Sequence, residues 1–112
     1  MRARSIGGSI LLTFMTAALG HGQSADQAAA GRRVYEARCQ SCHMPTGEPV
    51  EVIERTFQVD MRDLSSEEVQ AKESEQLGRD ILEGTGKMRP VTNLDTEAVA
   101  NLIAYLRSLA EE

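Results

Sequence analysis

Aromatic side chains are scarce in this sequence, which has no Trp and only two Tyr and two Phe among its 112 residues. Phe14 belongs to an N-terminal segment discussed below, which leaves Tyr35, Phe57 and Tyr105 for the rest of the chain. A domain of this length folds alone but has a small core. We therefore expect one domain with few bulky side chains inside it, and a large apolar cofactor would fill such an interior.

Metal-binding side chains are scarce as well, because the chain has two Cys and two His. A structural zinc site needs four nitrogen or sulfur ligands. His21 lies in the N-terminal segment, so Cys39, Cys42 and His43 are the remaining Cys and His donors. They are one ligand short, which argues against structural zinc.

No apolar run reaches the roughly 20 residues that a membrane span needs. The most apolar stretch, residues 10–19, follows Arg2 and Arg4 and precedes the small residues Gly20 and Gly22. This order is typical of a secretory signal peptide. We expect residues 1–22 to be a cleaved signal peptide and residues 23–112 to be an exported, periplasmic domain; an uncleaved anchor is the alternative.

Basic residues are fewer than acidic ones, 12 against 17, and the formal net charge is −5. Nucleic-acid binding needs clusters of Lys and Arg, so this class of function is disfavoured. The charge suits a protein partner with a basic docking surface, and such an association weakens as salt rises.

The apolar pattern predicts an all-α fold of three or four helices with structured connections and no strand. Asp26 is expected to be the N-cap of the first helix, which contains Gly31; this glycine costs up to about 1 kcal/mol relative to Ala unless another backbone packs against it. A second should begin with Ser74 as N-cap and end at Gly84. A short helix is expected after Ser65 or Ser66, and residues 53–64 remain unassigned. The last helix should follow Asp95 or Thr96, and its apolar stripe comprises Val99, Leu102, Ile103, Leu106 and Leu109. The helix from Ser74 should bury Leu77, Ile81 and Leu82.

The segment CQSCH, residues 39–43, admits several interpretations. A thioredoxin-like redox pair is expected near a βαβ pattern, which is missing here. A structural disulfide between residues three apart would close a very small loop and stabilise little. Covalent haem attachment uses all three residues: Cys39 and Cys42 form thioethers with the two vinyl groups, and His43 supplies an axial nitrogen to the iron. We expect haem c.

A second axial ligand is expected among the methionines. Met44 follows His43 directly and cannot reach the opposite face, which leaves Met61 and Met88. Met88 lies in a glycine-containing loop that Pro90 stiffens, whereas Met61 lies in a charged stretch. Met88 is the predicted sixth ligand.

The chain resembles the class I c-type cytochromes of bacteria, which are small, soluble and monohaem. GRRVYEARCQSCH resembles the first helix and haem site of that family, LGRDILEGTGKM its penultimate helix and methionine loop, and VANLIAYLRSL its last helix. The resemblance implies that Gly31 lets Tyr105 cross closely, and that the carbonyl of Pro45 or Pro49 accepts a hydrogen bond from the histidine. Arg89 departs from the family pattern, in which proline often follows the methionine, and it could place a cation at the haem rim.

With both axial positions filled, the iron has no open site for a substrate, so the expected function is one-electron transfer without enzymatic activity. Two alternatives remain open at this point. One is a cytochrome c subunit of a periplasmic dehydrogenase or oxidase complex. The other is a haem sensor with five-coordinate iron, which requires that Met88 does not bind.

Overall fold

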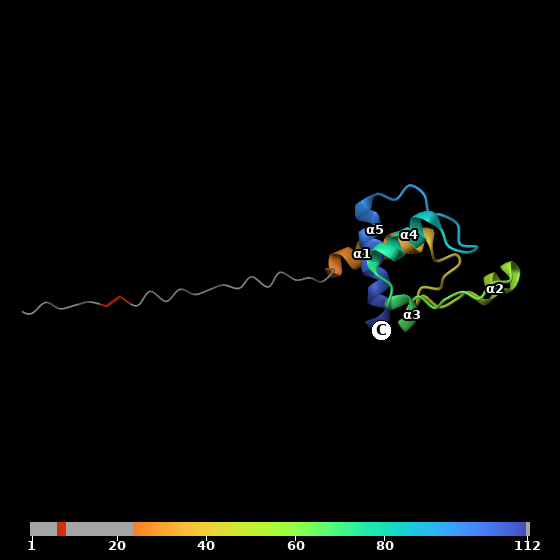
Figure 1. Ribbon diagram of the computed structural model, residues 1–112, viewed down its shortest axis with the longest axis horizontal. Helices are drawn as coiled ribbons and strands as arrows, with labels where there is room; N and C mark the ends of the chain where they lie inside the picture. Colours follow the sequence, from red (N-terminus) through yellow and green to blue (C-terminus); the bar gives the residue numbers. More distant parts are fainter. Residues whose placement is uncertain (1–6, 9–23, 112) are drawn as a thin grey trace, which may run out of the picture.

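The computed structural model describes residues 7–8 and 24–111, and within them the fold is helical (Figure 1). The elements are α1 (Ala25–Arg38), α2 (Glu51–Phe57), α3 (Glu67–Gln70), α4 (Ser74–Glu83), α5 (Thr96–Ser108) and the 3-10 turn η1 (Leu109–Glu111). Two isolated β-bridges occur in this part of the chain, but no strand. The predicted all-α fold is confirmed. The predicted signal peptide lies almost entirely outside the described residues.

Helix α1 begins slightly earlier than the sequence suggested. Ser24 is the N-cap: its side chain accepts a hydrogen bond from the Gln27 amide, and the Gln27 side chain accepts one from the Ser24 amide. This reciprocal arrangement satisfies two amides that the helix leaves without partners. The prediction of Asp26 as the cap is therefore wrong; Asp26 lies in the first turn, where its charge interacts favourably with the helix dipole.

Helix α5 carries the apolar stripe that packs against α1. Asp95 caps it by accepting a hydrogen bond from the Ala98 amide at 2.7 Å, as one of the two predicted caps. Most of the predicted stripe is buried (Leu102, Ile103, Leu106 and Leu109), and Val99 packs against the core from its edge. The α1–α5 pair makes the most extensive helix contact among the described residues.

Gly31 lies where α1 crosses α5, as expected, but its neighbour is a different one. A Cβ atom at Gly31 would lie 1.8 Å from the backbone oxygen of Asn101 and 2.9 Å from the amide nitrogen of Leu102. The atoms nearest to that position belong to the α5 backbone rather than to the Tyr105 side chain that the resemblance implies. Glycine is needed because the two helix backbones touch at this point.

Helix α4 follows the prediction with two corrections. Glu73, and not Ser74, is the N-cap residue, and it makes no side-chain capping hydrogen bond. Leu77 and Ile81 are buried in the core, whereas Leu82, expected on the same face, is 44% exposed. Gly84 ends the helix, as predicted.

Two short helices connect α1 to α4. Ser66 caps α3, as one of the two expected positions, by accepting a hydrogen bond from the Val69 amide. Helix α2 was not predicted; it buries none of its residues and ends at Gln58, which adopts a left-handed conformation with φ of 53°. Figure 1 shows α2 lying apart from the α1–α5 pair. The candidate site lies between them.

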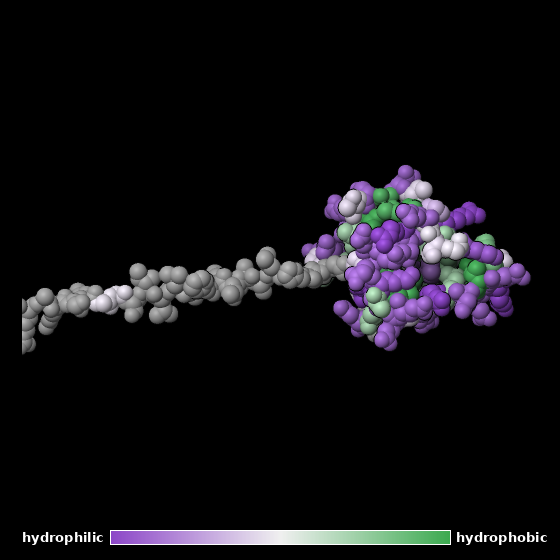
Figure 2. Space-filling view, viewed as in Figure 1, coloured by the Kyte–Doolittle hydropathy of each residue, from purple (hydrophilic) through white to green (hydrophobic). Residues whose placement is uncertain are grey.

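The core is small, as expected from the composition. Its buried apolar members are Tyr35, Val69, Leu77, Ile81, Leu102, Ile103, Leu106 and Leu109. Hydrophilic residues cover most of the face seen in Figure 2, with apolar side chains showing in separate patches. No helix of the described residues is long and apolar enough to cross a bilayer.

Candidate functional site

A cavity of about 950 Å³ opens between α1, α4, α5 and the segment that carries α2. This volume lies in the range of cofactor sites, and it is large for so small a domain. Most of its wall is apolar, including Ile53, Val59, Leu64, Val69, Leu77, Ile81, Val91, Leu102 and Leu106. The described residues thus enclose space for a large apolar group, which the shortage of aromatic side chains had suggested.

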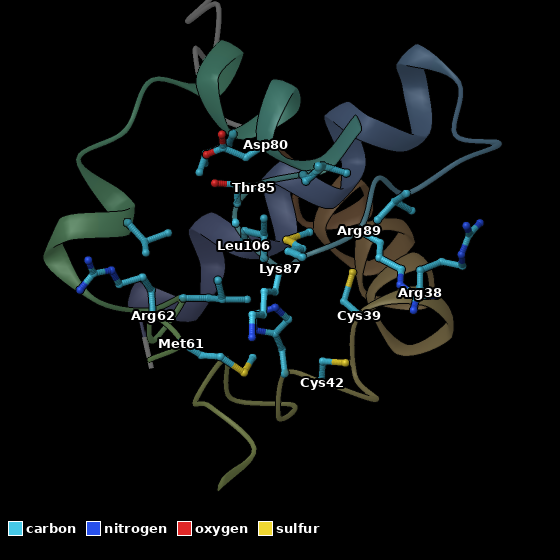
Figure 3. A pocket seen from close by; sticks show the side chains of 18 of the residues that line it. Arg38, Cys39, Cys42, Met61, Arg62, Asp80, Thr85, Lys87, Arg89 and Leu106 are labelled. Carbon is cyan, nitrogen blue, oxygen red and sulfur yellow. The ribbon is translucent and has the colours of Figure 1, made fainter. Parts of the chain in front are cut away.

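Cys39, Cys42 and His43 line this cavity together. Cys39 is the C-cap of α1, and its amide donates to the Tyr35 carbonyl at 2.8 Å. The chain then turns tightly, because the amides of Cys42 and His43 both donate to the Cys39 carbonyl, at 3.1 and 2.9 Å. In Figure 3 the two cysteines lie on one side of the cavity and Met61 on the other.

Both cysteines are free thiols, and neither is fully buried. Burial raises the pKa of the Cys39 thiol to about 11; Arg38 lowers this pKa and Cys42 raises it, but burial has the largest effect. A redox pair of the thioredoxin type has one thiol whose pKa is lowered, so that it is a thiolate at neutral pH. The environment of Cys39 has the opposite effect, which argues against a disulfide-exchange site.

Burial also lowers the pKa of His43, which keeps its imidazole neutral at pH 7 and leaves one ring nitrogen able to bind a metal. Its Nδ1 atom is buried and has no hydrogen-bond partner. The expected hydrogen bond to a proline carbonyl is therefore missing. The carbonyl of Pro45 accepts instead from the Tyr105 hydroxyl at 3.0 Å, while Pro49 pairs with His43 only as an isolated backbone bridge.

Met88 lies in the loop between α4 and α5 and is half-buried in the cavity wall. The amide of Met88 donates to the Thr85 carbonyl at 2.9 Å, and the Thr85 amide donates to the Met88 carbonyl at 3.1 Å. Gly84 allows this tight turn: its φ is 79°, and a Cβ atom there would lie 2.5 Å from the Met88 carbonyl oxygen. The loop geometry thus fixes the backbone of the predicted sixth ligand.

Met61 also lines the cavity, together with its charged neighbour Asp60. Its amide donates to the Glu54 side chain at 2.9 Å, which ties this segment to α2. The sequence argument held that a charged stretch would stay away from an apolar cofactor. The fold places both methionines in the cavity wall.

Cations are more frequent in the cavity wall than in the chain as a whole. Five of them line it (Arg38, Arg62, Lys72, Lys87 and Arg89), against two carboxylates, Asp60 and Asp80. The sequence had suggested such a role only for Arg89. Arg38 and Lys87 each donate to a backbone carbonyl of another segment, that of Thr92 at 2.9 Å and that of Phe57 respectively. Each of these hydrogen bonds joins residues that are far apart in the sequence, so the local sequence pattern does not predict them.

The donor set and the space fit a covalently bound haem. Two free thiols, a neutral imidazole with an unsatisfied buried nitrogen and two thioethers surround an apolar cavity, and nearby cations can balance the two propionates. Cys39 and Cys42 match the C-x-x-C-H pattern of haem c attachment. The fold and the site thus define a small helical protein with a cavity that suits a cofactor held through Cys39 and Cys42.

The family model "Cytochrome c" matches residues 28–110, and the chain belongs to this family of haem-based electron-transfer proteins. The match includes residues of every helix around the cavity. No curated protein and no solved structure gives a significant match.

Proposed function

We propose that this protein is a periplasmic one-electron carrier whose haem is attached through Cys39 and Cys42 and is ligated axially by His43 and Met88. The observation that supports this proposal most is the common cavity, which all four residues line although Met88 follows His43 by a long stretch of chain. The tight turn at residues 39–43 and the Gly84 turn bring them there.

When bound, the haem supplies an iron that cycles between the ferric and ferrous states, and a thioether ligand favours the ferrous state. The roles of the protein residues follow from their environment. Cys39 and Cys42 hold the group so that it is not lost between encounters with partners. His43 stays neutral because it is buried, and the mostly apolar wall would limit the contact of the bound group with water. A carrier with both axial positions occupied leaves no site for a substrate.

The axial assignment is tested with two variants of the holoprotein. Met88→Ala should open the iron, lower the reduction potential, and let carbon monoxide or cyanide bind readily. Met61→Leu is the matched control, since it removes the other thioether of the cavity wall while keeping an apolar side chain. The opposite pattern would move the sixth ligand to Met61, and two unchanged spectra would favour the five-coordinate sensor.

Export belongs to the same proposal. Residues 1–22 would be removed on secretion, and residues 23–112 would form the mature domain. Mass spectrometry of protein from a periplasmic extract tests this, because cleavage after Gly20 or Gly22 gives distinct masses. A full-length chain recovered from the membrane fraction would show that the segment is an anchor.

We also propose a redox partner with a basic docking surface, on the strength of the net charge of −5. Electron-exchange rates with a cationic and an anionic redox reagent, measured over a range of ionic strength, test the sign of the charge. Exchange should be faster with the cationic reagent, and salt should reduce the difference. Faster exchange with the anionic reagent would mean that Arg38, Lys87 and Arg89 dominate the contact.

A cytochrome subunit of a dehydrogenase or oxidase complex is the second candidate. The observation that favours it is α2, where Val52 and Phe57 are 55% and 47% exposed. Exposed apolar side chains of this size on one short helix suit a lasting interface. Affinity purification of the tagged protein from its native host should recover the protein alone if it is a free carrier, and with an enzyme chain in constant ratio if it is a subunit.

A further inference from the structure

Two tyrosines bind successive carbonyls of the loop that follows His43. Tyr35 belongs to α1, lies one turn before Cys39, and is fully buried. Its hydroxyl donates to the Met44 carbonyl. Tyr105 belongs to α5, and its hydroxyl donates to the Pro45 carbonyl at 3.0 Å. The two rings pack against each other, with centroids 5.0 Å apart and planes tilted by 60°.

This arrangement affects His43 because, among the described residues, no hydrogen bond to the ring Nδ1 atom fixes the orientation of the imidazole. The Nδ1 atom makes no hydrogen bond, so the orientation of the imidazole depends on the backbone on either side. On the N-terminal side, the His43 amide donates to the Cys39 carbonyl. On the C-terminal side, the next two residues are those whose carbonyls the tyrosines bind.

We propose that Tyr35 and Tyr105 are positioning residues for His43, and that their hydroxyls set the orientation of the axial imidazole through the Met44 and Pro45 carbonyls. The inference rests on the proposed ligation by His43. A tyrosine side chain has two rotatable bonds, and here its ring is held in the α1–α5 core. The hydroxyl therefore has a fixed position relative to α1 and α5. The hydrogen bond that it donates fixes the position of the loop after His43 as well. Burial raises the pKa of Tyr35, so its hydroxyl remains a donor at neutral pH.

A purely structural role is the competing explanation, and the structure separates the two. Phenylalanine would fill the same space in the core. The Met44 carbonyl also accepts from the Gly47 amide at 2.8 Å, so it keeps a partner when the hydroxyl is lost. Tyr35→Phe should therefore cost little stability, while the loop gains freedom. Tyr105 is less buried and Pro45 is exposed, so water can replace its hydroxyl, and Tyr105→Phe should have the smaller effect.

The test uses three variants of the holoprotein: Tyr35→Phe, Tyr105→Phe and the double variant that carries both substitutions. A fourth variant, Arg107→Met, is the control. Arg107 is the matched control: it also extends from α5 and donates to backbone carbonyls, those of Gln70 at the end of α3 and of Lys72, but neither residue belongs to the segment that follows His43. Electron paramagnetic resonance of the oxidised protein reports imidazole orientation, and the reduction potential and the melting temperature are measured alongside.

We expect the resonance of Tyr35→Phe to shift and broaden and its potential to fall, with a smaller change in Tyr105→Phe and the largest in the double variant. Arg107→Met should keep the parent signal even where it melts lower. Parent-like resonance and potential in the double variant would overturn the proposal and leave the ligand assignment standing. Two results would overturn both the positioning proposal and the ligand assignment. One is the absence of the low-spin histidine–methionine signal from the parent protein, and the other is its persistence in the His43→Ala variant.

Discussion

Gly31 in α1 and Gly78 in α4 both lie in helices that pack on α5. We expect replacement by alanine to destabilise the protein at Gly31 and to stabilise it at Gly78. At Gly31, a Cβ atom would lie 1.8 Å from the Asn101 carbonyl oxygen. At Gly78, it would lie 3.6 Å from Val99 Cγ1 and 3.9 Å from Ile103 Cδ1, which is ordinary van der Waals contact. Both glycines are buried within their helices, so the gain in helix propensity on replacement by alanine is similar, about 0.8–1.0 kcal/mol.

The difference between the two variants therefore measures packing alone. To accommodate a methyl group at position 31, α1 and α5 must separate by roughly 1.5 Å, and a close-packed interior does not absorb such a movement cheaply. Overpacking costs about 1–3 kcal/mol or more. We expect a net loss of about 2 kcal/mol for Gly31→Ala and a gain of about 0.5–1 kcal/mol for Gly78→Ala. For a domain of this size, these values correspond to a fall of roughly 10 °C and a rise of a few degrees in melting temperature.

Thermal unfolding of the two holoprotein variants, followed by far-ultraviolet circular dichroism, is the assay. Equal melting temperatures for Gly31→Ala and the parent would show that the α1–α5 crossing is wider than the structure has it. A fall of the same size in both variants would mean that glycine is needed in these helices for some reason other than the distance between backbones.

Two further substitutions probe the cavity wall. Gly84→Ala places a Cβ atom 2.5 Å from the Met88 carbonyl oxygen, at a residue whose φ is 79°. The turn that positions Met88 should be disturbed, so the far-red absorption band of a methionine-ligated ferric haem should weaken or disappear. A band of full strength would show that the turn does not position Met88. Burial alone would raise the pKa of Asp80, but hydrogen bonds from Gln76 and Lys72 and the charges of Lys72 and Arg79 lower it overall. A carboxyl group with a lowered pKa stabilises the fold above pH 3.8, its ordinary pKa, and this stabilisation is lost as the pH falls through the pKa of the folded state. Chemical unfolding should therefore show that Asp80→Asn costs about 1 kcal/mol or less at pH 7 and nothing near pH 2. A cost independent of pH would contradict the ionic explanation.

The helices that pack through a continuous apolar stripe could be predicted from the sequence, since α5 and the buried face of α4 follow the period of the helix. The same holds for the residues at the turn 39–43, whose spacing along the chain is also their arrangement in the site. Capping was less predictable. Ser24 and Asp26 are both good N-cap residues, and the choice of Ser24 depends on Gln27 reaching back to close the reciprocal pair.

The parts that could not be predicted depend on contacts distant in the sequence. Helix α2 buries none of its residues, so packing against the core does not reveal it in the sequence. The approach of Gly31 to Asn101, rather than to Tyr105, depends on the rotation of α1 about its axis. The resemblance implies that the carbonyl of Pro45 or Pro49 accepts a hydrogen bond from His43, but the Pro45 carbonyl accepts from the hydroxyl of Tyr105, which lies 60 residues further along the chain.

Covalent attachment of the haem at Cys39 and Cys42 is the central claim, and one measurement tests it directly. The protein is exported in a host that has the haem-attachment machinery, extracted with acidified organic solvent to remove any unattached haem, and weighed intact by mass spectrometry. The account predicts the mass of the mature chain plus one haem, and loss of that added mass when both cysteines are replaced by alanine. A chain that carries no haem after extraction, with Cys39 and Cys42 joined in a disulfide, would contradict it.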